Sequence, residues 1–365
     1  MSFSSKCLWH PVKATLCLTL LCTVLFMGTG SAFSETTESD VTSELVVVDA
    51  PLVKYFQKKS AGGQRFYDRA GIQKFYGEHE YVPVWLKADA FNKKAKQVIG
   101  VFGESWKHGL NPENYGYTKF SEASNAGLGD DPLLFEAMMS AAVVRYGRDM
   151  TSMRIPPSEI KQQSKFWQKP LESYSILTFV VGDRNTKKAM YALAPQSNIY
   201  VRLQKELLGV TKAIENGDET ENVLPLSVRG SLRLGDVSAI VEDIRYRLDA
   251  PSVKRGEDPT VYDDRLSQSV MAFQTLHGLK ADGIIGRKTI DAMNRTLKDK
   301  RDQIIVNLER IRWLESDMPS KYLVVNIPAQ TLWAIDDDKV EIEMPVIIGR
   351  YKRQTNSFVT RVTGV

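Results

Sequence analysis

One stretch of the sequence contains the residue types of a phosphate-binding loop. It reads FQTLHGLKADGIIGRKTIDAMN, from Phe273 to Asn294, and includes Gly286-Arg287-Lys288-Thr289. A phosphate-binding loop with the pattern G-x-x-x-x-G-K-[ST] follows a strand and surrounds the phosphates with backbone N–H groups. Here Arg287 separates the glycine from the lysine, and an amphipathic helix precedes the loop. The stretch therefore does not predict a phosphate site.

The same residues are typical of a turn between two helices. Gly278 can end the first helix in the left-handed conformation, and Leu279 supplies the apolar contact that accompanies such a cap. His277 lies where a helix C-terminus favours a positive donor, so we expect a capping histidine rather than a ligand. Asp282-Gly283 predicts a tight turn, and Gly286 is expected to permit a close approach to the next helix.

No other group of side chains predicts a catalytic or metal site. The chain has three cysteines, all within the first 32 residues: Cys7, Cys17 and Cys22. The histidines His79, His108 and His277 are far apart in the sequence, and they fit neither a zinc pattern nor a Ser-His-Asp triad. We therefore expect no catalytic residue, no metal and no cofactor.

Residues 1–32 have the organisation of a secretory signal peptide. A basic start is followed by the apolar run Ala14–Met27 and by the small residues Gly30 and Ala32. The apolar run is shorter than the roughly 20 residues that span a bilayer, which favours cleavage near Ala32 over a retained anchor. Export would remove every cysteine and leave no thiol for catalysis or disulfide formation.

The composition is that of an ordinary globular protein. The hydrophobic share is 43% and the charged share is 25% of the 365 residues, which predicts two or three domains. Basic and acidic residues are nearly balanced, at 48 against 44. A surface of mixed charge argues against nucleic acid as the main partner.

The periodicity after the predicted signal peptide is mainly helical. Residues 33–45 are polar and acidic and predict a flexible tether. Phe91, Ala95, Val98 and Phe102 recur on one helix face, and that helix should end at Gly109 with Leu110 folded back over it. Asp131 and Pro132 predict the start of another long helix. Residues 211–227 are polar and resemble a linker.

A compact three-helix unit follows, in residues 228–297. Three apolar stripes with helical spacing define it: Ile240, Ile244, Leu248; Leu266, Val270, Phe273; and Ile290, Met293, Leu297. Residues 298–318 predict a linking helix, with Ile304, Leu308 and Ile311 on one face. From residue 320, β-branched and aromatic residues alternate with polar ones around a turn at Asp336–Lys339, which predicts a hairpin. The predicted fold class is mainly α, followed by the start of a β-rich domain.

The three-helix unit closely resembles the peptidoglycan-binding module of bacterial wall enzymes. Glycine spacing and helix periodicity agree over about 60 residues. The matching positions are Leu232, Gly235, Leu266, Val270, Phe273, Gln274, Gly278, Leu279, Asp282, Gly283, Gly286, Thr289 and Asn294. We expect these residues to be mainly fold determinants, and the resemblance implies peptidoglycan stem peptides or glycan as the partner.

The flanking segments resemble the long periplasmic L,D-transpeptidases. FYGEHEYVPVWL (75–86), WKHGLNPENY (106–115) and RYGRDMTSMRIPP (145–157) are similar to the helical scaffold domain of that family, over residues 46–224. KYLVVNIPAQTLWAI (321–335) is similar to the first strands of its catalytic domain. The resemblance implies cell-wall biogenesis by 3→3 cross-linking, a periplasmic location and no stable membrane insertion after signal cleavage.

The chemistry of that family requires a cysteine within a sequence motif that this chain does not contain. In the family, a cysteine in a Ser-His-Gly-Cys motif takes an acyl group from one peptide stem and passes it to an amine of another. No cysteine follows Cys22, and no histidine follows His277. Two hypotheses result. The chain is an inactive, wall-associated relative, or it is the N-terminal portion of an active enzyme shortened by a frameshift, an early stop or an incomplete record.

Overall fold

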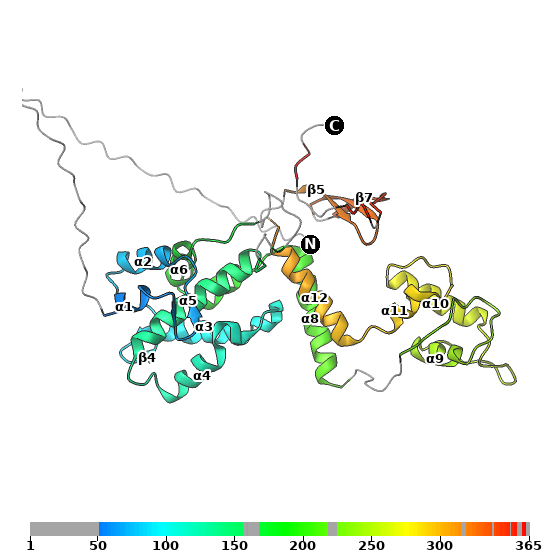
Figure 1. Ribbon diagram of the computed structural model, residues 1–365, viewed down its shortest axis with the longest axis horizontal. Helices are drawn as coiled ribbons and strands as arrows, with labels where there is room; N and C mark the ends of the chain where they lie inside the picture. Colours follow the sequence, from blue (N-terminus) through cyan, green and yellow to red (C-terminus); the bar gives the residue numbers. More distant parts are fainter. Residues whose placement is uncertain are drawn as a thin grey trace, which may run out of the picture. The chain divides into compact units, whose positions relative to one another are not determined.

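The computed structural model describes residues 51–155, 159, 168–217, 225–314, 319–337, 339–350, 352–355 and 360–362. The predicted signal peptide and the predicted tether lie outside these residues. The described part is mainly helical, with short strands towards the C-terminus (Figure 1), as the sequence predicts.

The N-terminal helical domain consists of helices with two small hairpins between them. Its elements are α1 (Val53–Phe56), β1 (Ser60–Ala61), β2 (Gln64–Arg65), α2 (Arg69–Glu78), β3 (Leu86–Lys87), β4 (Ala90–Phe91), α3 (Lys93–Gly103), the 3₁₀ turns η1 (Ser105–His108) and η2 (Pro112–Tyr115), α4 (Tyr117–Ala126), α5 (Pro132–Thr151), α6 (Ser173–Gly182), α7 (Thr186–Ala192) and α8 (Asn198–Glu215). Each hairpin is a two-stranded antiparallel sheet.

Helix α5 is the central helix of this domain, and most of its residues are buried. It starts as predicted, with Asp131 accepting a hydrogen bond from the Leu134 N–H and Pro132 in the first helical position. Gly147 allows α6 to pack closely, because a Cβ at this position would lie 2.7 Å from Cγ2 of Ile176. A helix that is apolar on nearly every face belongs in the interior of its domain.

Two predictions for the segment around α3 need correction. Phe91 lies in β4 rather than in the helix, although it is buried together with Ala95, Val98 and Phe102 in one core. The α-helix ends at Gly103, and the separate 3₁₀ turn η1 continues to His108. The predicted cap itself is confirmed, because Gly109 has a φ of 69° and the Leu110 N–H bonds the Ser105 carbonyl at 3.3 Å.

The predicted linking helix packs against the helical domain. Helix α12 (Leu297–Ile311) lies alongside α8 (Figure 1). Leu308 is fully buried in the core of the helical domain, and Ile304 and Ile311 pack against the same core. The predicted linker is shorter than expected, because α8 continues to Glu215. The three-helix module is therefore inserted between two helices of a single packed unit.

The module has its own hydrophobic core, and its helices are α9 (Ile240–Arg247), α10 (Asp264–Leu276) and α11 (Arg287–Met293). Two details differ from the prediction. Leu226, two residues before the predicted start, is buried in this core. Leu297 is the first residue of α12 and is not part of the core, because α11 already ends at Met293.

The C-terminal strands form an antiparallel sheet in the order β5 (Lys321–Asn326), β6 (Thr331–Asp336), β7 (Lys339–Pro345). The predicted hairpin is confirmed, since Asp336 lies opposite Lys339. One face of the sheet is apolar on all three strands. Its paired positions are Leu323 and Ala334, Val325 and Leu332, Ala334 and Ile342, and Leu332 and Met344.

Candidate functional site

The loop between α10 and α11 is held by the side chain of Gln274. This side chain is 2% exposed. Its oxygen accepts a hydrogen bond from the Gly283 N–H at 2.9 Å, and its nitrogen donates to the Ile284 carbonyl at 3.0 Å. The same nitrogen lies 3.2 Å from both Asp282 Oδ1 and Thr289 Oγ1. One buried amide thereby replaces the backbone partners that a tight loop lacks.

The start of this loop is a helix cap of the predicted kind. Gly278 has a φ of 65°, and the Leu279 N–H bonds the Gln274 carbonyl at 2.8 Å. His277 acts as the predicted cap, because its Nδ1 lies 2.8 Å from the Phe273 carbonyl. Its ring stacks on Phe273 with centroids 3.9 Å apart. His277 therefore contributes to the helix end.

The turn that follows depends on Asp282 and Gly283. Asp282 Oδ1 accepts from the Ile284 N–H at 3.0 Å, and this hydrogen bond, followed by that from Gln274, keeps the pKa of Asp282 below its usual value. Gly283 has a φ of 67°, and its carbonyl accepts from the buried Tyr262 hydroxyl at 2.5 Å. Asp282-Gly283 forms the tight turn that the sequence predicts.

The prediction for Gly286 is wrong. Its φ is −100° and its ψ is −175°, values that any residue adopts, and a Cβ placed there would have no atom within 4 Å. Gly286 therefore does not permit a close helix approach. Thr289, by contrast, is buried, and its hydroxyl also lies 3.3 Å from the Ile284 carbonyl.

Asn294 joins the two ends of the module. Its side chain accepts from the Leu226 N–H at 2.9 Å and donates to the Leu226 carbonyl at 2.9 Å. Arg247 Nη1 donates to the same amide oxygen at 2.9 Å. Asn294 thus pairs with Leu226 as a strand backbone would, which accounts for its place in the motif.

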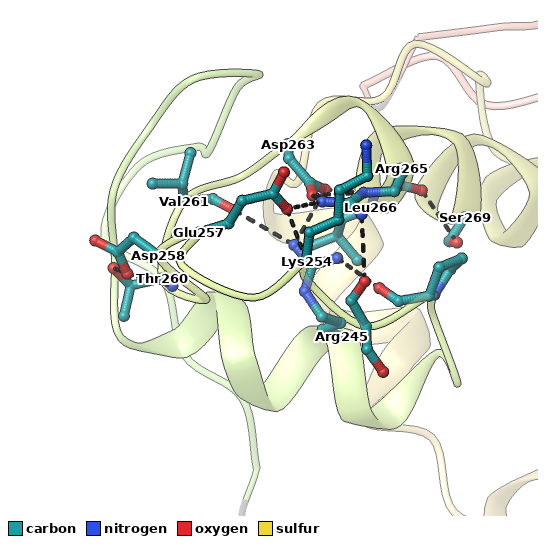
Figure 2. A network of polar contacts seen from close by, with 12 residues as sticks. Arg245, Lys254, Glu257, Asp258, Thr260, Val261, Asp263, Arg265, Leu266 and Ser269 are labelled. Carbon is teal, nitrogen blue, oxygen red and sulfur yellow. Dashed lines mark hydrogen bonds and ion pairs between the residues drawn. The ribbon is translucent and has the colours of Figure 1, made fainter.

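A network of ion pairs holds the long loop between α9 and α10 (Figure 2). Asp263 lies between two arginines, 3.0 Å from Arg245 Nη2 and 3.0 Å from Arg265 Nη2. Asp263 also caps α10 by accepting from the Leu266 N–H at 2.9 Å. Arg265 pairs in addition with Glu257, which accepts from the Lys254 N–H at 2.8 Å. These partners are structural and bind the loop to the start of α10.

The sequence did not reveal two buried polar clusters in the helical domain. In the first, Glu136 accepts from the Tyr76 hydroxyl at 2.5 Å and from the backbone N–H groups of Val84 and Trp85 at 2.7 and 3.0 Å. Burial raises the pKa of Glu136 to about 7, although these hydrogen bonds act in the opposite direction. Glu136 thereby fixes the segment before β3.

The second cluster fastens the end of α12 to the helical domain. The Arg312 side chain is fully buried and lies 3.0 Å from Glu309 Oε2, from the His108 carbonyl and from the Tyr200 hydroxyl. Arg154 also pairs with Glu309, at 2.6 Å. Burial raises the pKa of Glu309. The charges of Arg312 and Arg154 and the hydrogen bond from Trp313 Nε1 outweigh the effect of burial and hold the pKa at about 2.

The three histidines of the described residues are not assembled into a catalytic group. His79 and His277 each bond a backbone carbonyl of their own helix. His108 Nδ1 lies 3.0 Å from the Tyr200 hydroxyl and 2.9 Å from Gln204 Nε2. Burial, followed by the charge of Arg312, lowers the pKa of His108 to about 4. No group of three or more His, Cys, Asp or Glu that could hold a metal is present in the described part.

Comparison with protein families assigns three parts of the chain. Residues 70–207 match a scaffold domain, residues 238–293 match a peptidoglycan binding domain, and residues 320–365 match an L,D-transpeptidase catalytic domain. The chain belongs to the L,D-transpeptidase family. No curated protein matches the sequence.

The L,D-transpeptidase family assignment gives the module a partner. Its peptidoglycan binding domain indicates peptidoglycan, and the chain is a cell-wall-associated protein. Within the described residues, no helix has the length and apolar character needed to cross a membrane. The motif residues Gln274, Gly278, Asp282, Gly283 and Thr289 act within the fold, and a direct role in binding stays a prediction.

Proposed function

We propose that this chain is an exported protein that holds peptidoglycan through its three-helix module and presents it within the scaffold of an L,D-transpeptidase. The observation that supports this most is the match of residues 238–293 to a peptidoglycan binding domain, together with the closed module core. The basic and apolar N-terminal segment, with Ala32 near its end, supports export to the periplasm.

We also propose that residues 1–365 do not perform acyl transfer by themselves. Transfer in this family uses a thiolate, and the three cysteines of the sequence all lie in the proposed signal peptide. The contacts of the histidines support this view, since their partners are carbonyl oxygens, a tyrosine hydroxyl and an amide.

Two measurements on the exported form test these proposals. In co-sedimentation, the protein should bind purified peptidoglycan sacculi, and deletion of residues 225–296 should abolish the binding. After incubation with a carbapenem, which acylates the family's cysteine, intact mass spectrometry should show no adduct. A protein that stays in the supernatant contradicts the first proposal, and a drug adduct contradicts the second.

A further inference from the structure

Gly286 is a motif position whose identity the fold does not explain. Its backbone is extended, and a side chain there would meet nothing within 4 Å. It is also the N-cap of α11, where serine, aspartate or asparagine would stabilise the helix better than glycine. A glycine without a steric reason leaves the backbone bare, which suits the close approach of another molecule.

Basic residues follow this glycine in the sequence and also occur on the segment that is bridged to it. Leu232 and Ile285 exchange both backbone hydrogen bonds, at 3.1 and 3.0 Å, so the chain at Leu232 lies beside the residue that precedes Gly286. Arg229, Arg233 and Lys288 are exposed, and no partner of their side chains is found within the described ranges. We call this area the bridge surface and define it by Arg229, Arg233, Gly286, Arg287 and Lys288.

The acidic residues near the bridge surface neutralise little of this charge. Asp236 accepts from the Arg233 backbone N–H at 2.7 Å. Asp291 pairs with Arg287 at 3.8 Å, and the Arg287 side chain is 93% exposed, so water screens this contact. Leu234 and Val237, on the same segment as Arg233, are 56% and 66% exposed. The segment that carries Arg233 therefore also carries exposed apolar side chains.

We propose that the bridge surface binds the acidic peptide stems of peptidoglycan rather than its glycan strands. This inference rests on the proposed function and states which part of peptidoglycan the module recognises. Guanidinium groups pair with carboxylates through two parallel hydrogen bonds, and the stems carry carboxylates. The bare backbone at Gly286 admits the peptide main chain. In intact peptidoglycan the lactyl carboxyl groups of the sugar strand are bonded as amides to the stems, so the free carboxylates that pair with cations lie on the stems.

The test compares binding of the full chain to intact sacculi and to stem-free glycan, from which an amidase has removed the peptide stems and in which the lactyl carboxylates exposed by the cut have been converted to amides. The wild-type protein should bind intact sacculi, with an affinity that falls as salt rises, and should bind stem-free glycan at least about tenfold more weakly. The triple variant Arg229→Gln, Arg233→Gln, Lys288→Gln should raise the Kd for intact sacculi about tenfold or more. The matched control, Arg184→Gln, Arg202→Gln, Lys205→Gln, removes the same charge from exposed positions of the helical domain and should bind like wild type.

Gly286→Ser separates binding from folding. Serine suits the N-cap, so the melting temperature of this variant should stay the same or rise, while its affinity for intact sacculi falls. Equal binding of wild type to stem-free glycan would overturn the inference and leave peptidoglycan binding intact, as would unchanged binding by the triple variant. Failure of the wild-type protein to bind either preparation would overturn the proposed function as well.

Discussion

Single residues determine how the motif loop of the module folds. Gln274 supplies the hydrogen bonds inside the loop, and Gly278 and Gly283 supply backbone conformations with positive φ. Gly286 differs from these two glycines, because its backbone is extended and requires no positive φ. The four motif residues can therefore be separated by experiment into those that serve the fold and those that do not.

Gly278→Val should destabilise the isolated module, residues 225–296, by about 1–2 kcal/mol. A β-branched residue resists the left-handed conformation that the φ of 65° requires. Urea unfolding measures the difference. Gly286→Ala is the matched control from the same loop and should change stability by less than about 1 kcal/mol. Equal effects of the two substitutions would contradict the assignment of the cap.

His108 should make the helical domain less stable in acid. Its folded pKa of about 4 lies below its unfolded value of 6.5, so its contribution is complete above pH 6.5 and is lost as the pH falls through 4. The full difference corresponds to roughly 3 kcal/mol. Glu136 acts in the opposite direction, because its raised pKa of about 7 adds stability as the pH falls towards 4.5.

Comparison of variants isolates the contribution of His108. The melting temperature of His108→Asn should fall less between pH 7 and pH 4 than that of the wild type, since the variant has no buried imidazole to protonate. His79→Asn, which alters an exposed histidine of the same domain, is the control substitution. Parallel curves for all three proteins would show that His108 does not control the acid response.

At the scale of elements, α12 is the piece that connects the parts of the chain. It follows the module directly, packs on α8, and precedes the strands that match the catalytic domain. Its C-terminal end is held by Arg312 and Glu309, which meet His108, Arg154 and Tyr200 from three other segments. A displacement of α12 would therefore disturb the core of the helical domain. It would also move the point at which the chain leaves the module and rejoins that domain.

Arg312→Met should destabilise the helical domain by about 3–5 kcal/mol, because it leaves the buried Glu309 carboxylate without its closest buried cation. The double variant Arg312→Met, Glu309→Leu should recover part of this loss, since no buried charge remains unpaired. Chemical denaturation followed by tryptophan fluorescence measures both. A double variant that is no more stable than Arg312→Met alone would contradict this account of the cluster.

At the scale of the whole molecule, the parts differ in how completely they bury their apolar residues. The helical domain and the module each have a closed core. The C-terminal sheet has three strands, and Leu323, Ile342 and Met344 on its apolar face are 43–55% exposed. Every residue of β7 is exposed. Three strands need a packed face for independent stability, so we expect this region to be the least stable of the described parts.

Limited trypsin digestion should therefore cut the sheet region first, at Lys339, Arg350, Lys352 or Arg353. The helices of the helical domain and of the module should be cut later, because their backbone is hydrogen-bonded and packed. Mass spectrometry of the early fragments identifies the sites. A sheet region as resistant as the two helical parts would show that its apolar face is covered in solution.

The sequence by itself determined the local features of this protein. The caps at Asp131, Gly109 and Gly278, the three helical stripes of the module and the β6–β7 hairpin all depend on residues a few positions apart. Their physical causes, which are helix periodicity, left-handed glycine and turn pairing, act over one or two turns of chain. These features could therefore be predicted without knowledge of the rest of the molecule.

Only the tertiary structure decided which distant segments meet. Arg312 lies 204 residues from His108, and Glu136 lies 52 residues from Val84. Arginine and glutamate are usually exposed, so nothing in the local pattern marks these two as buried. Their burial is possible because the fold brings partners that satisfy each charge. For the same reason the sequence predicted α12 as a linking helix, whereas its packing on α8 makes it part of the helical domain.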